Sequence, residues 1–186
     1  NNTTYYYVGN HTLTIYGANN YVREYSICII PTVEGINESS TYNGKATFSV
    51  LSGNKIIVDG TTYTNECTIT EVGNHTLIIN GSNGYTFTYQ FTVTEIISID
   101  DVYENKVIIS IENDYQSITL DGKSIKNNSE CNILGKHTLV ITGVNGYTKT
   151  YEFTINPSIN GVENDKEYQT SVSWKIGGNA TIEVDG

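Results

Sequence analysis

The chain has 186 residues, of which 38% are hydrophobic and 16% are charged. This apolar content suffices for a folded core, and the charged fraction is too low for a disordered chain. The net charge of -10 excludes a surface for nucleic acid or anionic lipid, because such surfaces need clustered Lys and Arg. Apolar runs such as 27–30 are far shorter than the roughly 20 residues of a membrane span, so we expect none.

The composition favours strands over helices and gives no sign of a disulfide framework. There are 15 Tyr, 17 Gly and only 2 Pro. Met is absent even from position 1, and the N-terminus lacks the basic and apolar regions of a signal peptide, which indicates a mature piece or a segment of a longer protein. The 3 Cys are an odd number, and we interpret Cys28, Cys67 and Cys131 as free thiols.

A motif recurs along the chain. Gly9–Ile15 (GNHTLTI) returns as Gly73–Ile79 (GNHTLII) and again as Gly135–Ile141 (GKHTLVI), at offsets of 64 and 62 residues. Each copy is followed by a turn and a second apolar run, at 21–30, 85–93 and 147–155. Self-similarity at a fixed period indicates repeated structural units.

Hydrophobic residues alternate with polar ones in every copy, which predicts half-buried strands and no helix. In the first copy Leu13 and Ile15 share a face, and Tyr25 and Ile27 share a face of the run that follows. The same alternation appears in other runs, with Leu77/Ile79, Tyr89/Phe91, Leu139/Ile141, Tyr151/Phe153, Ile56/Val58, Ile118/Leu120 and Ile182/Val184 as pairs.

Turn motifs separate these runs. Asp59-Gly60 and Asp121-Gly122 predict tight hairpins, because a type I′ turn needs positive φ. Residues 81–84 (GSNG) and 143–146 (GVNG) predict a second, longer hairpin in each unit. The Asp-Gly motif occurs a third time at 185–186. Six or seven short strands per unit, each with one apolar face, predict two sheets packed on each other.

The order of the motifs resembles a known class. A Gly-Ile-Asn or Gly-Val-Glu opening (35–37, 161–163) precedes the Asp-Gly strand, and Glu-Cys-x-Ile, Gly-x-His-Thr-Leu and Asn-Gly-Tyr-Thr-x-Thr-Tyr-x-Phe-Thr follow it. This order resembles the tandem immunoglobulin-like repeat domains of bacterial cell-surface and secreted proteins. The resemblance covers essentially the whole chain and implies an all-β fold of tandem small immunoglobulin-like β-sandwiches, outside the cell. The His before Thr-Leu departs from the Tyr that is more usual there.

The repeat pattern divides the chain unevenly. We expect residues 1–31 to carry the C-terminal half of a unit, 32–94 and 95–156 to be complete units, and 157–186 to carry the N-terminal half of another. A half sandwich leaves an open apolar face and unpaired strand edges. One interpretation is head-to-tail completion by neighbouring copies, which builds a fibre. The other is that the chain is a window onto a longer tandem protein whose neighbouring units are covalently attached.

Candidate site residues do not converge. His11, His75 and His137 stand one per unit at equivalent positions, too far apart to share a metal, so we expect each to bond a backbone carbonyl. A Cys67–His75 nucleophile pair is conceivable, but the sequence suggests no third orienting group. We predict that Cys28 faces outward, where it is free to cross-link another chain.

Acidic residues near the unit junctions and aromatic residues along the chain are the remaining candidates for a binding role. The acids near the unit junctions are expected to form a solvated surface, with Ca²⁺ binding as the alternative: Glu95, Asp100, Asp101, Glu104, Glu163, Asp165 and Glu167. Tyr5–Tyr7 could form a stacking platform for sugars or a protein contact. Tyr25, Tyr89 and Tyr151 are in phase with core residues, and Trp174, which aligns with Phe48, is predicted to be in the core.

These observations predict a protein without catalytic, cofactor-binding or metal-binding residues. We expect a non-catalytic structural module of an extracellular surface protein or filament, acting as stalk, spacer or fibre subunit. Its partners would be neighbouring copies or further repeats, head-to-tail, with no nucleic acid. The alternative is an adhesin module that binds glycans or proteins, which would show an exposed aromatic cluster in one unit only.

Overall fold

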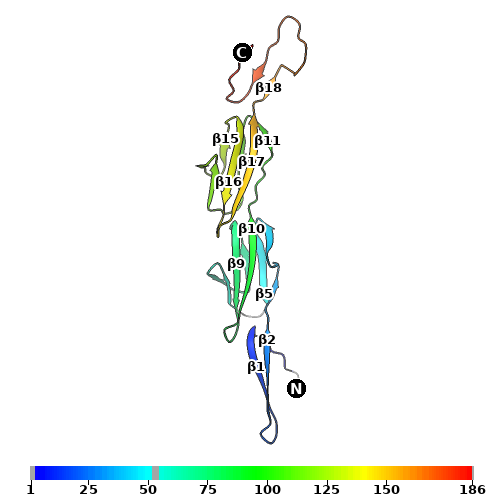
Figure 1. Cartoon of the computed structure of the whole chain (residues 1–186), viewed down its shortest axis with the longest axis vertical. Helices are drawn as coiled ribbons and strands as arrows, with labels where there is room; N and C mark the ends of the chain where they lie inside the picture. Colours follow the sequence, from blue (N-terminus) through cyan, green and yellow to red (C-terminus); the bar gives the residue numbers. More distant parts are fainter. Residues whose placement is uncertain (1–2, 52–54, 186) are drawn as a thin grey trace. The chain divides into compact units, whose positions relative to one another are not determined.

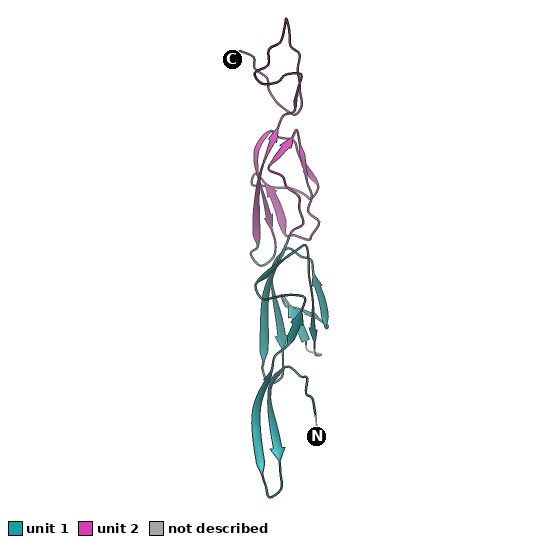
Figure 2. Cartoon of the chain, turned by 90° about the vertical axis from the view of Figure 1, so that its right-hand side faces the viewer, with its two compact units in different colours: residues 1–94, 144–147 teal, residues 95–143, 148–186 magenta. Residues whose placement is uncertain are grey.

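The structure, a computed structural model, describes residues 3–51 and 55–185. These residues form strands, turns and irregular segments without any helix (Figure 1), which confirms the predicted all-β class for this part of the chain. No helix able to cross a membrane is therefore found among them. Asn1, Asn2 and Gly186, which belong to the expected terminal segments, lie outside the described residues. The chain divides into two compact units, 1–94 with 144–147 and 95–143 with 148–186 (Figure 2).

Two sheets form the larger part of unit 1. The smaller sheet has the order β3-β5-β8, and the larger has the order β4-β10-β9-β6-β7. All pairs are antiparallel except β10 with β4, which is parallel. The strands are β3 (Thr32–Glu34), β4 (Ser40–Asn43), β5 (Ala46–Leu51), β6 (Lys55–Val58), β7 (Thr61–Tyr63), β8 (Glu66–Ile69), β9 (Gly73–Asn80) and β10 (Thr86–Thr94).

The inward faces of these two sheets share one apolar core. Phe48 of the smaller sheet and Ile56, Leu77 and Phe91 of the larger sheet all belong to the same buried cluster. Burial alternates along β9, as the period-two pattern predicted. Asp59 and Gly60 take φ values of 46° and 85°, so the tight hairpin between β6 and β7 forms as expected.

Unit 2 repeats this plan. Its larger sheet has the order β11-β17-β16-β13-β14, and β12 pairs with β15. Ile109, Ile118, Leu139 and Phe153 are among the residues of its buried cluster. The strands are β11 (Val102–Glu104), β12 (Val107–Ile109), β13 (Ser117–Leu120), β14 (Lys123–Ser124), β15 (Ser129–Cys131), β16 (Gly135–Thr142) and β17 (Thr148–Asn156).

A lone hairpin lies at the N-terminal end of unit 1. It consists of β1 (Gly9–Tyr16) and β2 (Val22–Ile29), which pair only with each other among the described strands. Leu13 lies opposite Tyr25 in this hairpin, just as Leu77 lies opposite Tyr89 between β9 and β10. The register is therefore the one used in the complete sheet, although no second sheet covers its apolar face.

In the described part of the C-terminal segment, residues 157–185, the strands are β18 (Ile159–Asn160) and β19 (Lys175–Ile176). The strand predicted around Ile182 and Val184 is wrong for this structure, since both lie in irregular chain. The corresponding strands β6 and β13 pair with β9 and β16, and the segment after β18 contains no such partner. Trp174 is 39% exposed, so its predicted core position is also wrong, whereas the aligned Phe48 is 2% exposed.

We predict that the same Leu→Ala substitution lowers the free energy of unfolding at two of three equivalent positions and leaves it unchanged at the third. Leu77→Ala and Leu139→Ala should each cost about 2–5 kcal/mol of unfolding free energy, because both side chains are fully buried. Leu13→Ala should leave the unfolding of both sheet cores unchanged in dilute protein, because Leu13 is 50% exposed. Chemical denaturation of the three variants checks this, and an equal cost at Leu13 would contradict it.

Candidate functional site

A histidine at the start of a long strand bonds a carboxylate in both complete sheets. His75 Nδ1 on β9 lies 2.6 Å from Asp59 Oδ2, and His137 Nδ1 on β16 lies 2.8 Å from Asp121 Oδ2. The second carboxylate oxygen accepts the backbone N–H of the residue after the histidine, at 2.9 Å in both sheets. Each pair therefore ties the Asp-Gly hairpin to the neighbouring strand, and we call it the His–Asp latch.

The other ring nitrogen bonds a backbone carbonyl. His75 Nε2 lies 2.9 Å from the oxygen of Glu71, and His137 Nε2 lies 2.7 Å from that of Ile133. His11 makes the same contact with Tyr7 at 2.8 Å, so the expected carbonyl bonds are present in all three. An oxygen atom therefore faces each ring nitrogen of His75 and His137, and the two contacts fix the orientation of each ring.

The aspartates of the latches were missed by sequence reasoning, which treated Asp59 and Asp121 only as turn residues. A usable signal was present, because in both units the latch joins residues 16 apart. The hydrogen bonds also change the acid chemistry of Asp121. Partial burial raises its pKa, but the N–H groups of Thr138 and His137 outweigh this effect and hold the pKa below its usual 3.8.

Unit 2 places a Cys, a His and an Asp side chain in line, with the thiol buried. Cys131 Sγ lies 3.9 Å from His137 Nε2, so the orienting carboxylate that the sequence did not reveal is Asp121. Cys131 is 3% exposed, however, and the imidazole nitrogen that faces it already bonds a carbonyl. At the equivalent Cys67, burial raises the pKa to about 11, which keeps that thiol protonated. These groups are packing and hydrogen-bonding elements of the core.

One residue assigned to the acidic surface is inside. Glu95 is 5% exposed and accepts a 2.5 Å hydrogen bond from the Tyr151 hydroxyl, so the expectation of a solvated Glu95 is wrong. Burial, together with this carboxylate, raises the Tyr151 pKa. The other acids of that set are exposed: Asp100, Asp101, Glu104, Glu163, Asp165 and Glu167. No group of three or more potential metal ligands occurs among residues 3–51 and 55–185.

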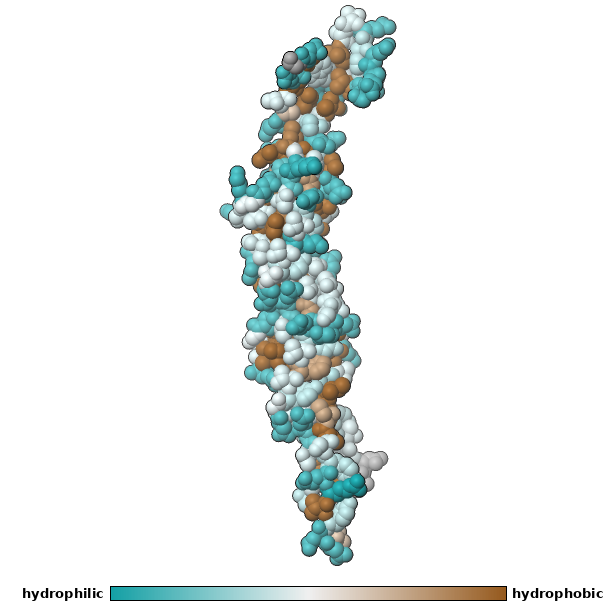
Figure 3. Space-filling view, in the orientation of Figure 1, coloured by the Kyte–Doolittle hydropathy of each residue, from teal (hydrophilic) through white to brown (hydrophobic). Residues whose placement is uncertain are grey.

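The terminal segments expose residues whose counterparts fill the cores. Leu13, at 50% exposure, corresponds to the fully buried Leu77. Ile182, at 54%, corresponds to the fully buried Ile56. Figure 3 shows hydrophobic colour reaching the surface in the C-terminal segment, at the top of the view. Further exposed apolar residues of these two segments include Ile15, Tyr25, Ile27, Ile30, Ile159, Trp174 and Val184.

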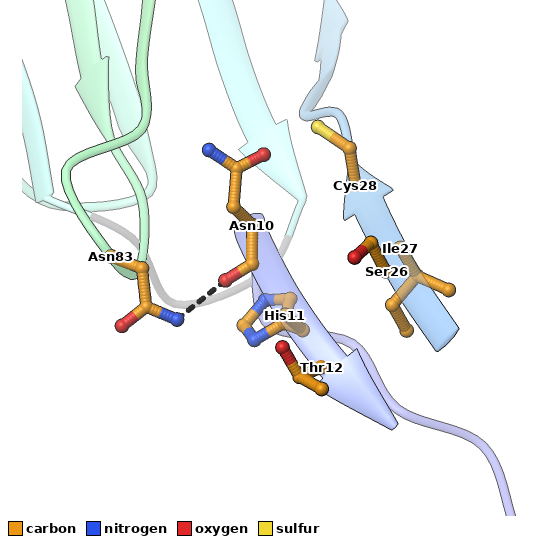
Figure 4. A pocket seen from close by; sticks show the side chains of 7 residues that line it. All are labelled: Asn10, His11, Thr12, Ser26, Ile27, Cys28 and Asn83. Carbon is orange, nitrogen blue, oxygen red and sulfur yellow. Dashed lines mark hydrogen bonds between the residues drawn. The ribbon is translucent and has the colours of Figure 1, made fainter. Parts of the chain in front are cut away.

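The hairpin tip after β9 sits on the chain just before and at the start of β1, within unit 1. The Asn83 side chain donates to the Asn10 carbonyl at 2.6 Å (Figure 4), and the Ser82 N–H donates to the Val8 carbonyl at 2.8 Å. A Cβ on Gly9 would collide with the Ser82 backbone, so this position requires glycine.

Residues 144–147, also part of unit 1, repeat these contacts on the start of β9. The Asn145 side chain donates to the Asn74 carbonyl at 2.6 Å, and the Val144 N–H donates to the Val72 carbonyl at 2.8 Å. A Cβ on Gly73 would collide with Val144. We call the glycine two residues before each histidine, together with the residue on either side of it, the seat. We call the Gly-x-Asn-Gly turn that contacts it the tip.

A groove lies beside the histidine in each case. The groove at His11 has a volume of about 540 Å³ (Figure 4), that at His75 about 420 Å³, and that at His137 about 520 Å³. Their linings correspond residue by residue at the histidine and the threonine after it. Because the groove recurs with the strands that form it, it does not single out one unit as a ligand site.

Exposed aromatic rings gather in the N-terminal segment. The Tyr5 ring lies 5.3 Å from that of Tyr7 and 4.9 Å from that of His11, and Tyr6 is 69% exposed. Among the described residues the exposed large aromatics all belong to the two terminal segments. Cys28 is exposed, as predicted, while Cys67 and Cys131 are buried free thiols.

The chain matches no protein-family model and no curated protein. Its similarities are to solved structures. One is the SGBP-B protein of the Bacteroides ovatus mixed-linkage glucan utilization locus, in complex with a mixed-linkage heptasaccharide. It is 16% identical, with a TM-score of 0.29, over 87% of this chain and 58% of that one. The chain thus spans less than two thirds of that protein.

Two further structures show a similar degree of likeness. The IG1+IG2 structure of DIP-gamma is 12% identical, with a TM-score of 0.24, over 67% of this chain and 96% of that one. A Ca²⁺-stabilized adhesin that helps an Antarctic bacterium bind ice is 13% identical, with a TM-score of 0.21, over 84% of this chain and 60% of that one. At these scores no residue role is transferred from any of them.

We predict an acid-dependent loss of stability at the Asp121 latch. The folded pKa of Asp121 lies below 3.8, so its stabilisation is complete above pH 3.8 and is lost as the pH falls through the lower folded value. Asp121→Asn should cost about 1 kcal/mol near pH 7 and flatten this acid limb. Denaturation of unit 2 from pH 7 to 2 measures both effects. Asp114→Asn, an exposed carboxylate in the same unit, is the matched control and should change neither.

Proposed function

We propose that the chain is a non-catalytic structural module of an extracellular surface protein or filament, built from tandem immunoglobulin-like β-sandwich units. The proposed units are 32–94 and 95–156, with half-units at 1–31 and 157–186. One observation carries the proposal: the terminal segments expose the counterparts of the residues that fill the complete cores. A face of this kind is stable in water only when another sheet covers it.

The two terminal segments are complementary in content. The N-terminal hairpin corresponds to β9 and β10 of unit 1, and the C-terminal segment corresponds to β3, β5 and β6. The hairpin supplies strands of the larger sheet alone, and the C-terminal segment supplies counterparts of β3 and β5 in the smaller sheet and of β6 in the larger one. A neighbouring copy or repeat, arranged head-to-tail, is therefore the partner that this chemistry favours.

The chemistry of the described residues supports a structural role. The latches, buried cysteines and grooves recur at equivalent positions, whereas a catalytic or ligand site would set one unit apart from the others. The reactive-looking Cys131 and His137 are enclosed in the core of unit 2. With a net charge of -10, copies of the chain repel one another, which opposes non-specific pairing between exposed strand edges.

An adhesin role is the second candidate, and the tyrosines at the N-terminal end favour it. Tyr6 and Tyr7 are exposed, and the aligned residues of unit 1 are Thr70 and Glu71, which are not core residues. Sandwich completion alone therefore does not explain these two rings. Tyrosine rings form good stacking surfaces for sugars and for protein partners.

We predict concentration-dependent association of the chain through its terminal segments. Val184→Asp should weaken it at least ten-fold, because burial of one Val contributes about 1.5–3 kcal/mol and a buried carboxylate opposes it. Ile108→Asp, at an exposed position of a complete unit, is the control and should have no effect. Sedimentation velocity in reducing buffer, which keeps Cys28 from cross-linking, measures both. A chain that stays monomeric at every concentration would contradict the head-to-tail proposal.

The adhesin alternative has its own test. Under the structural proposal we expect no glycan on an array to retain the intact chain above background. Retention that the double change Tyr6→Ala and Tyr7→Ala abolishes, and that Tyr21→Ala at the hairpin tip preserves, would support the adhesin role instead.

A further inference from the structure

We propose that the terminal segments of two copies join through an intermolecular His–Asp latch, with the Asp185 carboxylate of one copy bonded to His11 Nδ1 and the Thr12 N–H of the next. The inference rests on the proposed function and names its contact. In this arrangement residues 181–184 of one copy pair with β1 of the other, in the register that β6 and β9 use.

The C-terminal segment already has the register of a complete unit. Ile159 lies opposite Ile176, as Val33 lies opposite Val50 at the positions 126 residues earlier. Gly161 has a φ of 96° and abuts the Ser173 carbonyl. Its counterpart Gly35 has a φ of 98° and abuts the carbonyl of Thr47.

A tyrosine contact repeats as well. The Tyr168 hydroxyl accepts the Glu163 N–H at 2.8 Å, as the Tyr42 hydroxyl accepts the Asn37 N–H at 2.6 Å. The segment is thus organised as the first half of a sandwich, and residues around Ile182 and Val184, which correspond to β6, are irregular.

The N-terminal hairpin is organised as the second half. His11 lies opposite Ile27, as His75 lies opposite Phe91. His11 Nε2 already bonds the Tyr7 carbonyl, so the ring is oriented as in the complete latches. What the complete units add is a carboxylate at Nδ1, supplied by the residue before the Gly of an Asp-Gly turn.

Asp185 is the carboxylate that fits this place. It lies 126 residues after Asp59 and 64 after Asp121, in the third copy of the same Val/Leu-Asp-Gly motif. Its φ of 60° lies in the same left-handed region as the 46° and 50° of the two latch aspartates. The pairing also sets a carboxylate oxygen, which accepts hydrogen bonds, against an imidazole ring nitrogen that can donate one.

The start of β16 offers an open seat at Gly135 for the far end of the incoming hairpin. Nothing described lies within 4 Å of a Cβ placed on Gly135, which has a φ of 120°, whereas tips occupy the corresponding positions at Gly9 and Gly73. Residues 17–20 (GANN) of the β1–β2 hairpin correspond to the tip at 81–84, with Asn20 (φ 59°) at the position of the second glycine. When a second copy completes the segment after β17, its own tip is the matching occupant for this seat.

In the composite unit residues 181–184 take the place of β6 beside β1, because they lie 126 residues after 55–58. The register then follows from β6 and β9, where Ile57 lies opposite Ile78. The corresponding pair across two copies is Glu183 and Thr14.

Disulfide mapping of the full chain tests this register. In a Cys28→Ser background, one preparation carries Thr14→Cys and the other Glu183→Cys. Directly opposed residues of neighbouring strands meet the geometric needs of a disulfide. Mixing the two under mild oxidation should give a disulfide-linked dimer, and a chain carrying both changes should give a ladder of oligomers.

The control uses Glu24→Cys in place of Thr14→Cys. Glu24 lies opposite Thr14 on β2, one strand further from the proposed seam and about 10 Å from Glu183. It should link at least ten-fold more slowly. Equal linking of Glu24, or a doubly substituted chain that yields only an internally linked monomer, would overturn the proposed contact between copies.

The latch is tested separately by substitution at Asp185. Asp185→Asn should weaken association at least ten-fold in sedimentation velocity, while Glu183→Gln, the exposed carboxylate two residues before it, should not. Unchanged association of Asp185→Asn overturns the latch but leaves the proposed function standing. Absence of association in the unsubstituted chain overturns both.

Discussion

The structure depends on the need to cover the apolar face of an alternating strand. A sheet with Leu and Ile on one side gains its stability when a second sheet removes those side chains from water. Units 1 and 2 meet this requirement, and their core clusters draw on both of their sheets. The β1–β2 hairpin has the same hydrogen-bond register and the same alternation, yet its apolar face is open. Register and coverage are therefore separate properties, and only coverage distinguishes the hairpin from β9–β10.

The His–Asp latch gives the repeated unit a polar element inside its sheet. It joins a tight turn to a strand further along the chain and places both imidazole nitrogens against acceptors. The ring also packs on the aromatic side chain opposite it, at 5.3 Å from Phe91 for His75 and 5.3 Å from Phe153 for His137. A single histidine thus couples turn, strand and core. The same contacts place a Cys, a His and an Asp together in unit 2 as part of its folded core.

The tip and seat contacts likewise use few groups to connect one copy of the repeated motif to the next. The glycine two residues before each histidine leaves room for the backbone of the tip at the Gly9 and Gly73 seats. The Asn side chain of the tip donates to the backbone carbonyl of the residue after that glycine. Because the contact uses backbone groups and one short side chain, it tolerates the change from Ser82 to Val144 within the tip. The seat at Gly135 has the same φ region as the occupied seats, which makes the last motif a natural acceptor.

The sequence alone determined the all-β class, the two Asp-Gly hairpins, the outward Cys28 and the carbonyl contact of each histidine. These follow from local rules: alternation of side chains along a strand, positive φ at a tight turn, and the phase of one residue relative to its neighbours. The tertiary structure decided the partners that lie far away in the chain. It brought Asp59 to His75 and Asp121 to His137, buried Glu95 against Tyr151, and left Trp174 and the irregular chain around Ile182 exposed. Pattern assigns a residue to a face, but whether that face meets a second sheet depends on which strands are present to pair with it.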